Sequence, residues 1–347
     1  MRAVYAARTG GEDPLANLEV GDVDEAVMRP GWAMVHFAAG SLNHHDLWTL
    51  RGVSATPIVP PHVLGCDLAG TLFGYTDPEQ PEDVPQPGAR VVVHGVVRCG
   101  HCAACRGDEA APCRTARLFS ETPVAGTFSD QVLVPAENLI ALPDSVSFDA
   151  AACLPTAYLT AYHMLFARAA LQPGMTVLVH GVTGGVASAT ILLATIAGIT
   201  VYATSRDESK RALAVELGAR EAFAPERETA RALIARTGGM GVDAVIETVG
   251  DPTWELSLRA VRAGGTVVVA GATGGHNPPA QLNRVFYRNV TVAGSSMGTR
   301  AELRRLVDLC ASGRLQPLIG STYTMEQAHD AFAEMQRGEL RGKVILI

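Results

Sequence analysis

Residues 176–187 read TVLVHGVTGGVA, a short apolar run followed by a glycine-rich turn. Such a run is typical of a strand buried on both faces of a parallel sheet. Gly181 permits a tight turn, Gly184 lets the backbone approach a pyrophosphate, and the small Ala187 lets the following helix pack near its strand. The turn predicts a dinucleotide phosphate site at a helix N-terminus, although a purely structural turn is the alternative. Its expected contacts are Gly181, Val182, Thr183, Gly184, Gly185 and Val186.

Strand and helix patterns alternate on both sides of this turn. Strands are expected at 176–180, 199–204, 242–247, 265–270 and 290–294, and helices near 185–197, 207–217, 227–237 and 253–262. This alternation predicts an α/β fold with a doubly wound sheet. Residues 173–205 contain no Asp, Glu, Lys or Arg and meet the length of a membrane span. Their glycines fall where a strand-turn-helix-turn-strand unit needs them, so a membrane span is not expected.

The 347 residues exceed what one hydrophobic core usually organises, so we expect two domains. Residues 1–140 contain short apolar runs between prolines and glycines, which predict a β-rich domain. A helical pattern begins near Phe148, and the hairpin-like ending at 342–347 is expected to rejoin the first domain. Proline and acidic residues between 75 and 90 predict a solvated loop. The expected domains are 1–147 with 299–347, and 148–298.

The composition is typical of a soluble globular protein. The formal net charge is -7 and the pI is about 5.8, which argues against nucleic acid as a partner. Hydrophobic residues at 48% supply ample material for a core. The opening MRAVYAART lacks the apolar segment of an export signal, and we expect a cytoplasmic protein.

Four of the seven cysteines lie within fifteen residues, at Cys99, Cys102, Cys105 and Cys113. This spacing suits a tetrahedral zinc ion with four thiolate ligands, which leaves no open position for chemistry. We therefore expect one structural zinc per chain. Stray cysteines, a redox pair and disulfides are the alternatives.

Cofactor contacts are expected at the carboxyl ends of the parallel strands. An NAD enzyme usually has an acid at the end of the second strand, whereas this chain has Ser205 and Arg206, with Lys210 one turn later. These groups favour the 2′-phosphate of NADP(H), and Asp207 is expected to cap the next helix. A solvated helix face is the alternative for Arg206 and Lys210. Further backbone contacts are expected at Thr248, Val249, Ala270, Gly271, Ala272, Ser296 and Met297.

The chain resembles the medium-chain dehydrogenase/reductase superfamily, which includes zinc alcohol dehydrogenases and quinone oxidoreductases. The matching segments run nearly end to end: SLNHHDLW at 41–48, PHVLGCDLAG at 61–70, the cysteine lobe, LPTAYLTAY at 154–162, the glycine turn, and GKVIL at 342–346. The resemblance implies a GroES-like catalytic domain built from both chain ends and a Rossmann domain, with nicotinamide and substrate in the cleft between them. It identifies the cysteine lobe as the structural zinc site and implies a homodimer or homotetramer.

Three positions depart from the alcohol dehydrogenase pattern. The residues that would align with the catalytic zinc ligands are Asn43, Cys66 and Ala152, which are a poor ligand set. A second zinc would need substitutes among His44, His45, His62 and Cys153. The resemblance instead favours the zinc-free quinone and enone reductase branch.

We therefore expect an NADPH-dependent oxidoreductase that reduces a quinone or an α,β-unsaturated carbonyl compound. The expected catalytic residues are Asn43 and His45 as hydrogen-bond or proton donors, Asp46 as an orienting group, and Thr156, which by resemblance touches the nicotinamide. A purely structural His45 is the alternative for that residue. Two other functions stay open: an alcohol dehydrogenase with altered catalytic zinc ligands, and a non-catalytic NADPH-binding sensor.

Overall fold

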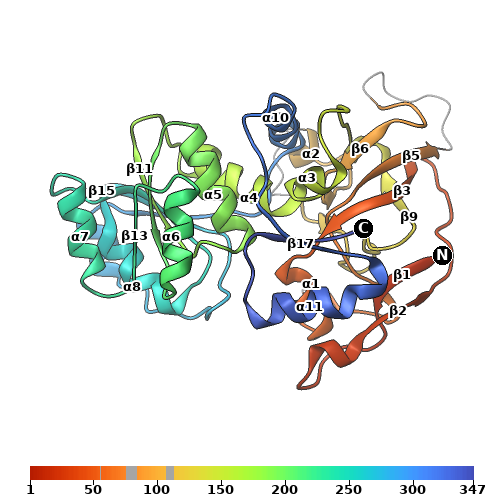
Figure 1. Ribbon diagram of the computed structural model, residues 1–347, viewed down its shortest axis with the longest axis horizontal. Coiled ribbons are helices and arrows are strands. Elements are labelled where there is room, and N and C mark those ends of the chain that lie inside the picture. The colour runs from red at the N-terminus through yellow and green to blue at the C-terminus, as the bar shows by residue number, and fades with distance from the viewer. Residues whose placement is uncertain (55, 76–83, 107–112) are drawn as a thin grey trace. The chain divides into compact units, whose positions relative to one another are not determined.

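A computed structural model describes residues 1–54, 56–75, 84–106 and 113–347 (Figure 1). The chain forms two compact units, Met1–Leu159 with Thr299–Ile347, and Thr160–Gly298. Most of the solvated loop expected between 75 and 90 lies outside the described residues.

The first boundary between the units differs from the expected one at 147/148. Helix α3 (Phe148–Ala152) packs on strands of the first unit. Farther along, the hydroxyl of Tyr158 accepts a hydrogen bond from the backbone N–H of Leu318 at 2.7 Å. These contacts attach residues 148–159 to the first unit, so the compact second unit begins at Thr160.

The first unit is rich in strands, as expected for residues 1–140. Its seven-stranded sheet has the order β10-β6-β5-β3-β18-β17, with β9 also paired to β3, and a three-stranded sheet has the order β2-β1-β4. The strands are β1 (Arg2–Ala6), β2 (Leu18–Asp22), β3 (Trp32–Ser41), β4 (His62–Val63), β5 (Ala69–Tyr75), β6 (Arg90–Val93), β7 (Val96–Val97), β8 (Arg117–Leu118), β9 (Gln131–Pro135), β10 (Leu139–Ala141), β17 (Ile319–Tyr323) and β18 (Lys343–Leu346).

The last fifty residues rejoin the first unit, as expected, but the hairpin-like ending is wrong. Strand β18 pairs antiparallel with β3 and parallel with β17. Parallel neighbours need a crossover connection, and α11 (Ala328–Arg337) lies between the two strands in the chain. The sequence pattern missed this because an apolar strand looks the same whichever direction its neighbour runs.

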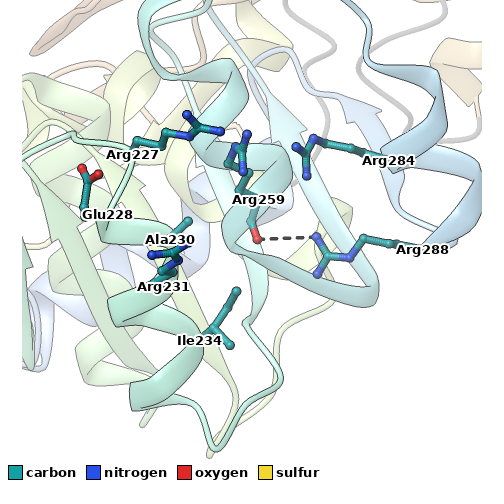
Figure 2. Close-up of a pocket in the computed structure, with 8 residues that line it drawn as sticks. All are labelled: Arg227, Glu228, Ala230, Arg231, Ile234, Arg259, Arg284 and Arg288. Atoms are coloured by element: carbon teal, nitrogen blue, oxygen red, sulfur yellow. Dashed lines mark hydrogen bonds between the residues drawn. The ribbon is translucent and has the colours of Figure 1, made fainter.

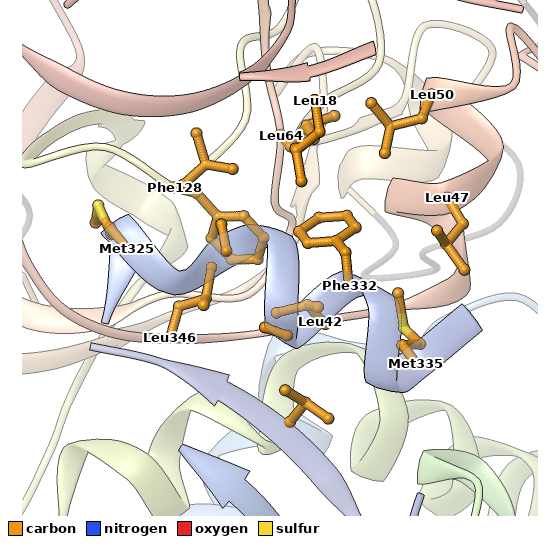
Figure 3. Close-up of a cluster of buried hydrophobic side chains, with 14 of the residues drawn as sticks. Leu18, Leu42, Leu47, Leu50, Leu64, Phe128, Met325, Phe332, Met335 and Leu346 are labelled. Carbon is orange, nitrogen blue, oxygen red and sulfur yellow. The ribbon is translucent and has the colours of Figure 1, made fainter. Parts of the chain in front are cut away.

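Helices of the first unit cover a buried apolar cluster (Figure 3). Phe332 and Met335 of α11 pack in this cluster with Leu47 and Leu50 of α1 (His44–Leu50). The cluster therefore joins the two ends of the chain in one core. The other helical segments of this unit are η1 (Pro14–Asn17), α2 (Ala103–Arg106), η2 (Ala136–Asn138), η3 (Leu154–Tyr158), α10 (Arg300–Ala311) and η5 (Met325–Gln327).

The second unit contains a six-stranded parallel sheet of order β13-β12-β11-β14-β15-β16. Its strands are β11 (Thr176–His180), β12 (Thr200–Thr204), β13 (Glu221–Phe223), β14 (Val242–Glu247), β15 (Val261–Val269) and β16 (Thr291–Gly294). Its helices are η4 (His163–Arg168), α5 (Gly185–Ile196), α6 (Glu208–Glu216), α7 (Thr229–Arg236), α8 (Asp251–Ala260) and α9 (Leu282–Tyr287), and α4 (Leu159–Tyr162) lies at the junction of the two units.

The strand order confirms the doubly wound sheet. From β11 the chain proceeds to one edge through α5 and α6, and from β14 it proceeds to the other edge through α8 and α9. Right-handed crossovers in opposite directions place the two helix pairs on opposite faces of the sheet. The five strands and four helices expected here are all present, whereas the short β13 and α9 are additional.

Residues 173–205 form β11, α5 and β12 in place of a single long helix. Among the described residues, no helix combines the length and apolar character that crossing a membrane requires.

Candidate active site and metal centre

The glycine turn has the backbone geometry that the sequence predicts. Gly181 follows β11 with φ of 83°, in the left-handed region that favours glycine. Gly184 is the N-cap of α5, and a Cβ placed on it would meet no described atom within 4 Å. Open space therefore borders the first turn of α5, whose free N–H groups suit an anionic phosphate.

The other expected cofactor contacts lie at the same edge of the sheet, because each follows a parallel strand. Ser205 follows β12, Thr248 follows β14 and Ala270 follows β15. Beyond β16, Met297 is buried with φ of 53° and its sulfur accepts a hydrogen bond from the Thr160 hydroxyl at 3.9 Å. The fold thus gathers these segments around the glycine turn, while their contact with a cofactor stays a prediction.

The residues that follow β12 include positively charged side chains and one acid that caps the next helix. Asp207 caps α6, as expected, and its Oδ1 accepts the N–H groups of Ser209 at 2.7 Å and Lys210 at 3.3 Å. Arg206 is exposed. The guanidinium of Arg211 donates to the carbonyls of Ser205 and Arg206, which fixes the backbone at this strand end.

The sequence analysis missed a buried polar network at the carboxyl ends of β11, β12 and β14. The ring nitrogens of His180 lie 2.9 Å from the hydroxyls of Thr204 and Ser257, and Ser257 donates to Glu247 at 2.6 Å. Glu247 also accepts the N–H groups of Val249 and Gly250. Burial lowers the pKa of His180, so the ring is neutral at neutral pH. The network ties the ends of β11, β12 and β14 together, directly below the segments expected to contact the cofactor.

The four cysteine sulfurs of the lobe lie close together. Cys105 Sγ is 3.5 Å from Cys102 Sγ and 3.7 Å from Cys99 Sγ, and Cys113 Sγ is 3.8 Å from Cys99 Sγ. Four thiolates around zinc at ~2.3 Å per bond would be separated by about 3.8 Å, the edge of a tetrahedron. The residues present therefore fit a tetrahedral metal ion, and all four ligand atoms lie within 4.8 Å of one another. Residues 107–112 of the lobe lie outside the described residues.

Two of the four thiols in the lobe favour the thiolate form. Backbone N–H groups of His101 and Cys102 lower the pKa of Cys99 to about 5. The backbone N–H of Cys99 lowers that of Cys113 to about 7. Strands β7 and β8 pair on either side of the lobe and hold its two ends together. Burial and the neighbouring thiols of Cys102 and Cys113 instead raise the pKa of Cys105 to about 12. The lobe thus supplies the geometry that a divalent metal needs, and two of its thiols favour the charge state.

A second polar cluster forms around Asn43, the N-cap of α1. The ammonium of Lys343 donates to Asn43 Oδ1 at 2.7 Å and to the Leu42 carbonyl at 2.6 Å. The amide nitrogen of Asn43 donates to Asp67 Oδ2 at 2.8 Å and to the Ser41 carbonyl at 3.1 Å. Lys343 and Asp67 were not singled out by the sequence analysis, although both lie in the segments GKVIL and PHVLGCDLAG that carried the resemblance.

This cluster does not fit a zinc ion at the three aligned positions. Both polar atoms of the Asn43 amide are engaged, and Ala152 offers no ligand atom. Burial raises the pKa of the Cys66 thiol well above its usual range, which disfavours the thiolate that zinc binds. The Cys66 sulfur lies 3.6 Å from Thr156 Oγ1, so Thr156 belongs to the same cluster.

His45 and Asp46 follow Asn43 on α1 and have different surroundings. Asp46 is fully buried, and its two oxygens accept the N–H groups of Asn43 and Gly65. Burial raises the pKa of Asp46 to about 6. His45 Nε2 lies 3.6 Å from a carboxylate oxygen of Glu121, whereas its buried Nδ1 has no hydrogen-bond partner in the described part of the chain.

The pKa of His45 reflects opposing effects. Burial lowers it, but the contact with Glu121 and the charge of Asp46 outweigh burial, and the net shift is upward. The contact with Glu121 thus favours the protonated ring against the effect of burial, and no described group partners Nδ1. Glu121 was not found by the sequence analysis, because nothing near it in the chain indicates a role.

Known proteins share this architecture. Models of the alcohol dehydrogenase GroES-like domain and the zinc-binding dehydrogenase match residues 29–144 and 185–312. A solved NAD-dependent alcohol dehydrogenase is 31% identical, with a TM-score of 0.93, over 100% of this chain and 99% of that one. Quinone oxidoreductase of Mus musculus is 30% identical over 67% of this chain and 72% of its own length. Crotonyl-CoA carboxylase/reductase of Cereibacter sphaeroides is 26% identical over 97% of this chain and 84% of its own length.

The paired GroES-like and Rossmann-type units, with a glycine turn at the sheet edge, define a dinucleotide-dependent oxidoreductase. The chain belongs to the medium-chain dehydrogenase/reductase superfamily, which confirms the family and the fold class expected from the sequence. Its relatives act on different substrates, so membership by itself leaves the substrate open.

Proposed function

We propose that this chain reduces a quinone or an α,β-unsaturated carbonyl compound with NADPH, and that its zinc is structural only. The observation that carries the proposal is the Asn43 amide held between Lys343 and Asp67, where an alcohol dehydrogenase of the family would hold its catalytic metal. Without a Lewis acid, oxidation of a simple alcohol lacks its main electrostatic support. An electron-poor acceptor needs less support, because the added charge delocalises onto its oxygen.

The residues of the first unit have separable roles in this proposal. When bound, NADPH supplies the hydride that adds to a carbon of the acceptor. His45 donates the Nδ1 proton to the developing enolate or phenolate oxygen, and Glu121 raises the pKa of the ring. Asn43 is engaged on both sides, so we assign it a positioning role beside Cys66 and Thr156.

The test is an assay of NADPH oxidation with a panel of quinones and enones, together with the zinc content of the purified protein. One zinc per chain and oxidation with at least one acceptor support the proposal. Two tightly held ions would support the second candidate, an alcohol dehydrogenase with altered ligands, for which ligand atoms of His45, Asp46 and Cys66 lie within 4.8 Å of one another. Tight NADPH binding without oxidation by any acceptor would favour the sensor.

Replacing Arg206 tests the preference for NADPH. Arg206→Gln is expected to weaken NADPH binding by about tenfold, because a charge-assisted contact with the 2′-phosphate is lost. NADH affinity should change little. Fluorescence titration with both cofactors measures the effect, and Arg220→Gln, an exposed arginine after α6, serves as the matched control. Equal losses for NADPH and NADH would contradict the assignment.

We also propose a homodimer or homotetramer. Strand β16 is the last strand of its sheet, and Val292 in it is 44% exposed. An exposed edge strand is a template for pairing with a second chain, which supports self-association.

A further inference from the structure

Several arginine side chains line a pocket of the second unit. The residues of this pocket follow the glycine turn by forty or more positions in the sequence. The pocket has a volume of about 520 Å³, a size typical of small-ligand sites. It is formed by α7, α8 and α9, and its lining residues are Arg227, Glu228, Ala230, Arg231, Ile234, Arg259, Arg284 and Arg288. The pocket therefore contains five guanidinium groups, although the whole chain has a net charge of -7.

The arginines approach the pocket from different elements. Figure 2 shows Arg284 of α9 and Arg288, the residue after α9, extending toward Arg259 on α8. Arg227 extends from the segment before α7 on the other side. Arg259, and more weakly Arg227 and Arg284, lower the pKa of the Glu255 carboxyl. Arg259 pairs with this carboxylate directly, while Arg227 and Arg284 act on it only through their charge.

Three of these five arginine side chains donate hydrogen bonds to neighbouring groups of the protein. Arg288 donates to the carbonyls of Leu258 and Val261 at the end of α8, which is a capping role. Arg259 pairs with Glu255 at 2.7 Å, and Arg284 donates to Gln281 at 2.7 Å. The guanidinium groups of Arg227 and Arg231 donate no hydrogen bond within the ranges that the structure describes, and the two residues are four positions apart around the start of α7.

The positive guanidinium groups in this pocket repel one another, and a bound anion would offset that repulsion. Burial, together with the charge of Arg284, lowers the pKa of Arg288. Glu228 and Glu255 supply two negative charges against five positive ones. Guanidinium groups match phosphate oxygens in pairs of parallel hydrogen bonds, and several around one pocket suit a ligand with several phosphates.

We propose that this pocket binds an oligophosphate, a chain of two or three phosphate groups, at a site separate from the dinucleotide. Arg227, Arg231 and Arg284 hold the phosphates, while Arg288 keeps its capping role. The ligand is either free inorganic oligophosphate or the phosphate chain of a nucleotide.

Calorimetric titration of the full chain with inorganic tripolyphosphate tests the proposal, with nicotinamide dinucleotide added at saturation to fill the other phosphate site. Saturable binding is expected, and the double variant Arg231→Gln/Arg284→Gln should weaken it by at least about tenfold. Arg236→Gln removes the same charge from α7 outside the pocket, where Arg236 pairs with Glu221, and should leave the affinity unchanged. A parallel titration with ATP separates the two ligand sources, since tighter binding of ATP identifies a nucleotide.

Absence of saturable tripolyphosphate binding, or an equal loss in Arg236→Gln, would overturn the proposal. If the double variant does not fold, Arg227→Gln decides, because this exposed side chain donates no described hydrogen bond. Its affinity should fall by about threefold or more, and an unchanged affinity rejects the site. The titration measures binding alone, so it stays decisive even if the chain proves inactive toward quinones and enones.

Discussion

Cys105→Ser is expected to release the bound metal and to lower the stability of the first unit sharply. The Cys105 sulfur lies within 3.7 Å of the sulfurs of Cys99 and Cys102, so it occupies one vertex of the ligand set. A serine hydroxyl is not among the groups that hold structural zinc, and three remaining thiolates leave the shell open. Structural zinc contributes roughly 10–16 kcal/mol in zinc-finger peptides, and we expect a loss on the order of 3 kcal/mol or more here.

Metal analysis and thermal unfolding of the same preparations measure this effect. Cys310→Ser is the matched control, since Cys310 is a half-buried cysteine of α10 outside the cluster. Lowering the pH should release the metal from the wild type as well, because thiolates must be deprotonated to bind it. Full metal content and an unchanged melting temperature in Cys105→Ser would show that the four thiols are not a metal site.

His45→Asn is expected to reduce kcat by about 10²–10⁴-fold, the range for loss of a well-placed proton donor. In the wild type, kcat/KM should fall as pH rises through the pKa of His45, which lies above its usual value of 6.5. Glu121→Gln removes a contact that raises this pKa, so the fall should move to lower pH. Profiles of kcat/KM against pH measure the shift.

The same pKa has a consequence for stability. Because the pKa of His45 is raised in the folded state, the contribution of His45 to stability is complete below its unfolded pKa. This contribution is lost as pH rises through the folded pKa.

Glu137→Gln, which changes an exposed acid of the same unit, is the control for the profiles of kcat/KM against pH. An activity profile that stays in place in Glu121→Gln would remove His45 from the proton-transfer role.

Much of the second unit was predictable because its signals are local. Apolar runs that alternate with helical patterns specify parallel strands, and each element is recognised within a dozen residues. The short β13 carries too few residues for such a pattern. Helix α9 spans only six residues, Leu282–Tyr287, which is too short for a helical period to be recognised.

The candidate site was only half predictable for a similar reason. Asn43 and His45 stood out through resemblance, but the partners that decide their chemistry did not. Lys343 meets Asn43 across 300 positions of sequence, and His180 meets Ser257 across 77. Glu121 approaches His45 from a loop whose residue types indicate no function.

The sequence by itself determined the doubly wound sheet, the glycine turn and the cysteine spacing, because periodicity and spacing are properties of neighbouring residues. The tertiary structure alone decided that β17 and β18 run parallel, that Lys343 and Asp67 hold Asn43, and that arginines from three helical segments line one pocket. These contacts depend on strand order and chain crossing, which bring distant residues together and leave no periodic trace in the sequence.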